Sequence, residues 1–255
     1  MEKIRFIDLE VHSAYENMAI DESIMLSMME GSVGPTLRFY RWKPTAVSIG
    51  TFQGMNDEVD VDFCRSNDID VIRRITGGGA VYHDYDGEIT YSILLPKGHR
   101  LAPDDIVESY KILCEGVIKG VEHLGIHAIF KPVNDVISNG KKISGNAQTR
   151  RHSCVLQHGT VLLDLDVSMM FQALKVPLEK ISDKMIADVR ERVTSISDVL
   201  GRKVRMDELR DALKKGFSDA LHVELVSSTL TNDEIKKMEQ LVVEKYSTKE
   251  WNFKR

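Results

Sequence analysis

Apolar residues recur at helical spacing in several parts of the chain. Residues 18–30 predict an amphipathic helix that begins near Asn17. Its apolar face would consist of Ile20, Ile24, Met25, Met28 and Met29. A longer helix is predicted over residues 106–124, with Gly125 at its C-terminal end. Asp207 and Asn232 are suitable N-caps. The pattern therefore predicts that the last third of the chain is helical, with helices over residues 188–200, 207–221 and 232–246.

Short runs of β-branched and aromatic residues predict strands in the first two thirds. Residues 36–42 and 45–50 are parted by Lys43-Pro44 and predict a hairpin. Asn139-Gly140 is a strong hairpin signal between residues 135–138 and 142–144. Further strands are predicted over residues 69–74, 88–95, 155–157 and 160–163, the last two as a pair. We expect an α+β fold with one domain over residues 1–255, including a helical annex at about 187–255.

Composition narrows the class of protein without naming a function. Hydrophobic residues make up 42% and charged residues 29% of 255 positions, as in folded globular proteins. The net charge of −5 argues against a general attraction to nucleic acid or anionic membrane. No apolar run is long enough to span a bilayer, and the N-terminus does not resemble a signal peptide, so we expect a cytoplasmic protein. The odd number and wide spacing of Cys64, Cys114 and Cys154 predict buried core thiols.

A glycine cluster gives the densest chemical signal. Arg73-Arg74 is followed closely by Gly77-Gly78-Gly79. Consecutive glycines allow backbone N–H groups to converge on an anion, and guanidinium groups match phosphate or carboxylate. The spacing fits neither a P-loop nor a dinucleotide-binding fingerprint. Taken alone, the cluster also fits a plain tight turn beside solvated arginines.

A lysine pair follows the Asn139-Gly140 turn. Strand periodicity places Lys141 and Lys142 on opposite faces, and Lys142 has little bulk beside it, so it is the better candidate for a cleft. Asp135 is a candidate ligand for an Mg²⁺ ion that would also be bound by phosphate oxygens. Together these groups suit the attack of a carboxylate on the α-phosphate of ATP, which needs fixed positive charge more than a protein nucleophile. The alternative is that the lysines are only solubilising charges at a hairpin tip.

Several motifs in fixed order resemble the lipoate-protein ligase A family. They are Arg73-Arg74-x-Thr76-Gly77-Gly78-Gly79-Ala80-Val81-x-His83-Asp84, Asn134-Asp135, Gly140-x-Lys142-Ile143-Ser144-Gly145-x-Ala147, His158-Gly159-Thr160, Val189-Arg190-x-Arg192-Val193-Thr194 and Glu250-Trp251-Asn252-Phe253. The resemblance implies the biotin and lipoate protein ligase fold, which is similar to class II synthetases. It implies mixed, largely antiparallel sheets flanked by helices.

The resemblance also implies an activity. Lipoate and ATP with Mg²⁺ would give lipoyl-AMP, and the lipoyl group would pass to a lysine of a lipoyl domain. The acceptors would be 2-oxoacid dehydrogenase complexes or the glycine cleavage H protein. Lys142 would be the catalytic cation and Asp135 the metal ligand. The residues implied to bind ATP or lipoyl-AMP are Arg73, Arg74, Thr76, Gly77, Gly78, Gly79, Ala80, Val81, Tyr82, His83, Asn134, Asp135 and Lys142.

Longer family members continue past the Trp-Asn-Phe segment into an accessory domain. Since this sequence stops at Arg255, we expect a separate small protein to supply that domain.

Two other functions remain open from the sequence. The first is an ATP-independent octanoyl- or lipoyl-transferase of the same fold, which would use a cysteine thiolate. Its nucleophile would precede the Gly-x-Lys element, where residues 126–140 contain no cysteine, and Cys154 suits a buried strand better. The second is a non-catalytic lipoyl- or biotin-binding regulator, although no DNA-binding motif accompanies it.

Overall fold

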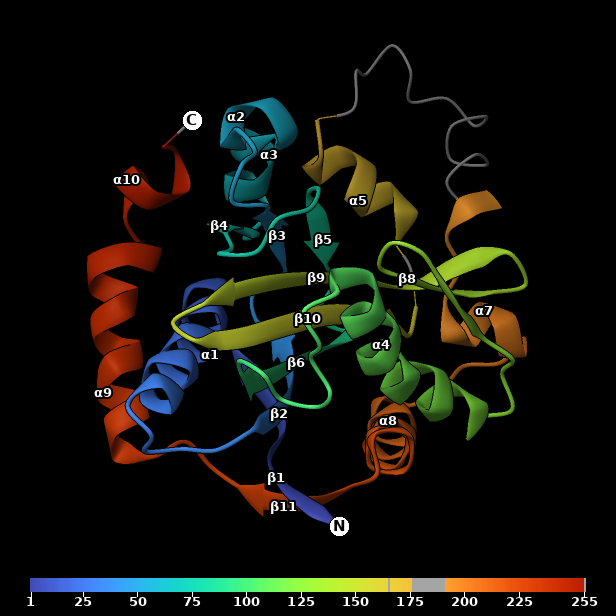
Figure 1. Cartoon of the computed structure of the whole chain (residues 1–255). Coiled ribbons are helices and arrows are strands. Elements are labelled where there is room, and N and C mark those ends of the chain that lie inside the picture. Colours follow the sequence, from blue (N-terminus) through green and yellow to red (C-terminus); the bar gives the residue numbers. More distant parts are fainter. Residues whose placement is uncertain (165, 176–190, 255) are drawn as a thin grey trace.

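The computed structural model describes residues 1–164, 166–175 and 191–254 (Figure 1). An eight-stranded sheet has the order β11-β1-β2-β6-β10-β9-β8-β7, and a three-stranded sheet has the order β4-β3-β5. The strands are β1 (Glu2–His12), β2 (Thr36–Trp42), β3 (Ala46–Ile49), β4 (Asp70–Arg73), β5 (Val81–His83), β6 (Glu88–Pro96), β7 (Ile129–Lys131), β8 (Asp135–Ser138), β9 (Lys141–Arg151), β10 (Cys154–Leu162) and β11 (Val223–Ser228).

Helices cover both faces of the large sheet (Figure 1). They are α1 (Ala14–Met29), α2 (Met55–Glu58), α3 (Val61–Ser66), α4 (Ile106–Glu122), α5 (Val167–Ala173), α7 (Ile196–Leu200), α8 (Met206–Leu221), α9 (Asn232–Leu241), the π-helical turn η2 (Val242–Tyr246) and α10 (Lys249–Asn252). Antiparallel pairs predominate, and only β1–β11, β1–β2 and β3–β4 are parallel among the described strand pairs. The expected α+β fold with largely antiparallel sheets flanked by helices is confirmed.

The core divides between the two faces of the large sheet and the outer side of the small one. Helices α4 and α8 pack on one face, where Phe217 contacts Phe39 and Tyr91. Helix α1 packs on the other face and is covered by α9. A third apolar cluster joins the small sheet to α2 and α3. Among the described residues, no helix combines the length and the apolar composition that a membrane span requires.

Several local predictions are confirmed and others are wrong. Strands β8 and β9 form the predicted hairpin, and Asn139 and Gly140 both adopt positive φ there. The hairpin predicted over residues 36–50 is absent, because β2 pairs with β1 and β6 while β3 belongs to the small sheet. The strand pair predicted over residues 155–163 is one continuous strand, β10.

The helix boundaries also differ from the sequence prediction. Helix α1 begins four residues earlier than predicted, because Ser13 and Glu16 form a capping box, and it is buried on nearly every side. Helix α9 is capped by Thr231, not by Asn232, and α8 has no side-chain cap. Helix α4 ends at Glu122, before Gly125. Of the helix predicted over residues 188–200, only residues 188–190, which include Val189 and Arg190, lie outside the described residues. The prediction of one continuous helix is wrong for the rest, because Val193 forms a β-bridge with Lys142 and α7 covers only Ile196–Leu200.

Candidate functional site

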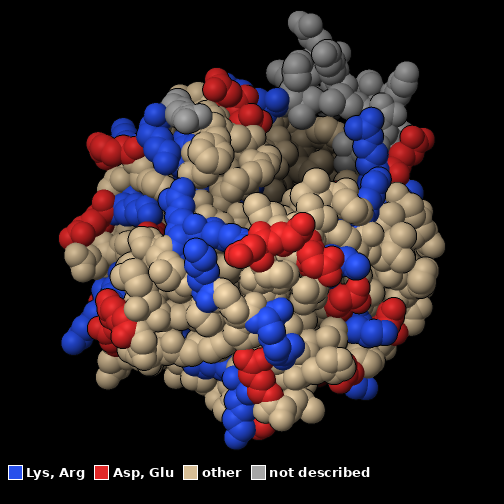
Figure 2. Space-filling view, in the orientation of Figure 1, with Lys and Arg blue, Asp and Glu red and all other residues tan. Residues whose placement is uncertain are grey.

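A cavity of about 310 Å³ lies between the two sheets. Strands β3 and β5 form one wall, and β9 and β10 form the facing wall. Much of its lining is apolar, and Figure 2 shows this face of the molecule hollowed beside α5, which contributes to that lining. The apolar residues are Met18, Trp42, Ala80, Val81, Ala147, Leu162, Met170, Leu174 and Val193. A lining of this kind can hold an alkyl chain.

Arg74 is buried at one side of the cavity and binds protein acceptors with its whole side chain. Its Nε donates to Thr76 Oγ1 at 3.1 Å, and its Nη1 donates to the carbonyl and hydroxyl oxygens of Ser48 at 3.2 and 3.1 Å. Its Nη2 donates to the carbonyl oxygens of Gly77 and Gly79 at 2.9 and 2.7 Å. These bonds occupy every N–H that a guanidinium carries. Burial lowers the pKa of Arg74 to about 10.

Arg73 faces the other side of the small sheet, because successive strand residues point in opposite directions. It is fully buried and donates to the carbonyl oxygens of Gly50, Thr51, Trp251 and Asn252. The backbone N–H of Arg73 also donates to Asn252 Oδ1 at 2.8 Å. The prediction that Arg73 lines the binding cleft is therefore wrong. Its guanidinium joins α10 to β4 instead.

The glycine loop is held by its carbonyl groups as well as by close packing. Gly78 adopts a φ of +98°, which disfavours residues with a side chain. Gly50 approaches the loop so closely that an added Cβ would lie 2.1 Å from the carbonyl oxygen of Gly78. Since the carbonyls of Gly77 and Gly79 point at Arg74, the loop and the arginine fix one another. The carbonyl groups of the loop therefore bind the arginine.

Lys142 lines the cavity from β9 and is paired with Asp135. Its Nζ lies 2.6 Å from Asp135 Oδ1, and the two side chains are 37% and 31% exposed. Gly145 leaves the space that this lysine occupies, because a Cβ there would lie 2.6 Å from Nζ. Lys141 lines a different cavity. Among the described residues, no group of three His, Cys, Asp or Glu side chains is placed to hold a metal ion.

A hydroxyl, an imidazole and a carboxylate form a buried chain at the cavity wall. Ser48 Oγ lies 2.8 Å from His83 Nε2, and His83 Nδ1 lies 2.7 Å from Glu88 Oε1. Trp42 stacks on the His83 ring with centroids 4.0 Å apart. Ser48 and Glu88 were missed by the sequence analysis. An isolated serine in the apolar run of β3, and a glutamate opening the buried strand β6, were the available signals.

A second chain of the same kind lies on the opposite side of Arg74. Thr76 Oγ1 lies 2.8 Å from His158 Nε2, and His158 Nδ1 lies 3.6 Å from Asp21 Oδ2. Burial, opposed by the Asp21 carboxylate, lowers the pKa of His158. Asp21 also accepts hydrogen bonds from Arg38 and Ser92. Arg74 thus lies between two hydroxyl groups, each backed by a histidine.

The Lipoyl protein ligase A/B catalytic domain family model matches residues 13–218. The chain belongs to this family. Octanoyltransferase LipM of Brevibacillus brevis is 37% identical and covers 100% of each chain. One similar solved structure comes from a study of a bi-partite lipoate protein ligase and its E2 lipoyl domain from Thermoplasma acidophilum. It is 36% identical to this chain, the alignment covers 99% of this chain and 96% of the solved chain, and the TM-score is 0.86. A lipoate-protein ligase A solved with ATP is 34% identical over 99% of each chain, with a TM-score of 0.83.

The relatives in this family correct the predicted chemistry. Curated relatives matching 98–100% of the chain at 32–37% identity are octanoyltransferases, so the prediction of an ATP-dependent, adenylate-forming ligase is wrong. A transferase moves an acyl group that is already activated, and it therefore needs neither ATP nor Mg²⁺. The predicted cofactors are wrong for the same reason.

Within this family member, the predicted site residues fall into two groups. Those that line the cavity are Arg74, Gly78, Gly79, Ala80, Val81, Tyr82, His83, Asn134 and Lys142. Those that do not are Arg73, Thr76, Gly77 and Asp135, although Thr76 and Gly77 bind Arg74 and Asp135 binds Lys142.

No thiol lines the cavity, and all three cysteines of the chain lie in its described part. Cys64, Cys114 and Cys154 are buried and free, as the sequence predicted. Burial raises the pKa of Cys64 to about 11 and that of Cys114 to about 12. Burial also raises the pKa of Cys154. Thiols with raised pKa values stay protonated and are poor nucleophiles.

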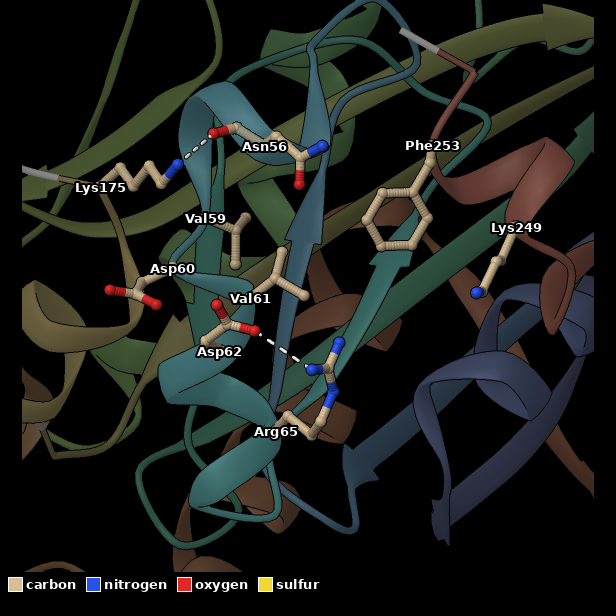
Figure 3. A pocket seen from close by; sticks show the side chains of 9 residues that line it. All are labelled: Asn56, Val59, Asp60, Val61, Asp62, Arg65, Lys175, Lys249 and Phe253. Atoms are coloured by element: carbon tan, nitrogen blue, oxygen red, sulfur yellow. Dashed lines mark hydrogen bonds and ion pairs between the residues drawn. The ribbon is translucent and has the colours of Figure 1, made fainter.

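A second cavity beside α2 and α3 is lined largely by charged side chains (Figure 3). Its Arg65 pairs with Asp62 at 3.1 Å, and Lys175 donates to the carbonyl oxygen of Asn56 at 2.6 Å. The side chains of Asp62 and Arg65 are 91% and 76% exposed. Surface pairs of this kind contribute little energy, and they form no enclosed site.

Proposed function

We propose that this protein transfers an octanoyl group from a thioester donor to a lysine of a lipoyl domain. The observation that carries the proposal is the full-length relationship to octanoyltransferases, which covers 100% of both chains at 37% identity. The acceptor is proposed from the family and from the E2 lipoyl domain named with the Thermoplasma acidophilum ligase. Lipoyl domains of 2-oxoacid dehydrogenase complexes and the glycine cleavage H protein are the acceptors to compare.

The cavity supplies what such a transfer needs. Its apolar lining would hold the alkyl chain, and the polar groups that also line it, Asn134 and Lys142 among them, would face the carbonyl group. Attack on a thioester carbonyl places negative charge on its oxygen. A fixed ammonium beside that oxygen stabilises the transition state, and we assign this role to Lys142, which lines the cavity. Asp135 would hold the lysine in place between turnovers.

Transfer without ATP is the direct test. The purified chain is incubated with an octanoylated carrier protein and an unmodified lipoyl domain, and the acceptor is followed by intact-protein mass spectrometry. We expect the mass of one octanoyl group to be added to the acceptor lysine. The same chain with ATP, Mg²⁺ and free lipoate or octanoate should give no product. Product formed only in the arm with ATP would contradict the proposal.

Lys142→Ala and Lys141→Ala form a matched pair for the same assay. The two lysines are neighbours on β9, but only Lys142 lines the apolar cavity. Removing a group that stabilises the oxyanion lowers the rate by about 10²–10³-fold. We expect this loss for Lys142→Ala and close to the wild-type rate for Lys141→Ala. Equal losses in both variants would contradict the role given to Lys142.

A further inference from the structure

The backbone around Lys142 determines where its ammonium lies in the cavity. The side chain starts on β9, and its Nζ pairs with Asp135 Oδ1 on the neighbouring strand β8 at 2.6 Å. That pair fixes the far end of the side chain, whereas the face of the sheet from which the side chain leaves is set by β9 itself. Because Lys142 is the cation of the proposed function, the inference rests on that function.

Strand β9 carries an extra residue directly after Lys142. Two consecutive residues of β8 pair with Ser144 and Lys142, so Ile143 between them is inserted into the ladder as a bulge. In a regular strand, residues three apart point to opposite faces. Here Lys142 and Gly145 both line the cavity, and a Cβ on Gly145 would lie 2.5 Å from Lys142 Cε. The bulge therefore brings Lys142 to the cavity face.

A short segment before α7 supplies a backbone partner at this bulge. Among the described residues, the ladder between β9 and β10 ends at Ser144, before it reaches Lys142. Val193 forms a parallel bridge with Lys142 instead, and the backbone N–H of Thr194 donates to the Lys142 carbonyl oxygen at 2.9 Å. Val193 also lines the cavity. The same two residues thus close the cavity and bind the strand that carries its lysine.

Helix α7 and the core hold this segment in place. Thr194 is only 8% exposed, and the next residue, Ser195, caps α7 by accepting the N–H of Asp198 at 3.1 Å. Ile196 is fully buried in the same apolar cluster as Ile143, the extra residue of β9. The donor at Thr194 therefore comes from an element that is packed into the core together with the bulge.

We propose that Thr194 is a positioning residue, whose backbone N–H holds the β9 bulge in the register that aims Lys142 into the cavity. A shift of one residue in a strand moves its side chains to the opposite face of the sheet. Loss of this hydrogen bond would let the bulge shift, and the ammonium would move away from the thioester carbonyl. The Thr194 side chain takes no part in this role.

Removal of the N–H tests the proposal. Catalysis depends on the placement of charge, so we expect Thr194→Pro to lower kcat for octanoyl transfer by at least about tenfold, with KM for the octanoyl carrier little changed. Thr194→Ala keeps the N–H and should restore a rate close to that of the wild type. An amide-to-ester exchange at the same bond replaces the N–H by an oxygen atom without a proline ring. It should lower kcat as proline does, and it decides the question if the proline variant does not fold.

A double-mutant cycle separates an effect through Lys142 from a general loss of structure. The Lys142→Ala background has no ammonium to misplace, so removal of the Thr194 N–H should lower its remaining rate no further. An equal loss in the wild-type and Lys142→Ala backgrounds would overturn the proposal and leave the proposed function intact.

The reactivity of the Lys142 amine reports its placement without a transfer assay. Trace labelling with acetic anhydride, followed by peptide mass spectrometry, compares Lys142 with Lys119, which pairs with Glu122 on α4. We expect the ester variant to raise the labelling of Lys142 relative to Lys119, because the lysine moves away from Asp135. Unchanged labelling would overturn the inference. Raised labelling in a chain whose wild type transfers no octanoyl group would support the placement and overturn only the proposed function.

Discussion

The Arg74 guanidinium lies between the hydroxyl groups of Ser48 and Thr76 and donates a hydrogen bond to each. A hydroxyl that accepts from a cation directs its own proton elsewhere, and here each hydroxyl faces the Nε2 of a histidine. One buried arginine thus binds both hydroxyl groups, and each hydroxyl lies within hydrogen-bonding distance of a histidine Nε2.

Gly145 is the residue at which the position of Lys142 can be changed without removing its charge. In Gly145→Ala the new Cβ would lie 2.5 Å from Lys142 Cε, so the lysine chain must swing away. Because the displaced atoms are the far end of a flexible side chain, the fold should tolerate the change. We expect the rate of octanoyl transfer to fall at least about tenfold, since catalysis depends on placement of charge.

The measurement is steady-state transfer together with a thermal melt. Gly34→Ala serves as the control, because a Cβ at that exposed position meets nothing within 4 Å. Full activity in Gly145→Ala would show that the position of Lys142 does not matter.

We predict that the Arg73 side chain stabilises the folded protein. Arg73→Ala would remove the guanidinium donor from buried carbonyl oxygens of the loop after β3 and of α10. An unpaired buried polar group costs about 1–3 kcal/mol, so we expect the free energy of unfolding to fall by about 3 kcal/mol or more. Urea denaturation measures this change. Arg65→Ala, whose side chain is 76% exposed, should stay within about 0.5 kcal/mol of the wild type.

At the scale of elements, glycines determine how closely α4 and α8 approach. A Cβ at Gly216 on α8 would lie 2.1 Å from the backbone nitrogen of Gly120 on α4. A Cβ at Gly116 would lie 2.3 Å from the Phe217 ring, which also packs on the large sheet. The two helices therefore meet backbone against backbone. The stripe of small residues on α4 and α8 explains why both helices fit on one face of the sheet.

Gly216→Ala tests this packing. The new methyl group meets backbone atoms of α4, which cannot rotate away, so the helices must separate. Overpacking of this kind costs about 1–3 kcal/mol, and the loss should outweigh the gain in helix propensity from alanine. We expect a lower melting temperature, measured by circular dichroism. An unchanged or higher melting temperature would contradict the close approach.

The accuracy of the element predictions depended on how local the decisive contacts are. Asn139-Gly140 encodes its own turn, because both residues favour positive φ, and the hairpin was predictable from the sequence. The runs over residues 36–42 and 45–50 look like a hairpin locally. The first run pairs with β1 and β6, and the second pairs with β4 and β5. Pairing with strands so distant in the sequence cannot be recognised from the residues of the two runs.

The site was predictable to a similar extent. The glycine loop and Lys142 stand out by composition, whereas Ser48 and Glu88 are ordinary residues until the fold brings them to His83. Ser48 and His83 are 35 positions apart, and Thr76 and His158 are 82 apart. Arg73 was assigned to the wrong face although strand alternation already separated it from Arg74.

At the scale of the whole molecule, the buried polar chains join the two sheets. Thr76 follows the small sheet, His158 lies on β10 of the large sheet, and Asp21 on α1 completes the link. Burial lowers the pKa of His158 below the ordinary value of 6.5, so the folded state resists a proton that the unfolded chain accepts.

Stability should therefore fall as the pH is lowered below about 6.5, because the unfolded chain gains a proton there that the folded chain does not. One such proton contributes up to about 1.4 kcal/mol per pH unit. We expect His158→Gln to flatten the pH dependence of the free energy of unfolding between about pH 7 and 5. The exposed His127, changed to Gln, should leave the slope as in the wild type. If urea titrations show the same slope in His158→Gln and the wild type, His158 is not the group that couples protonation to folding.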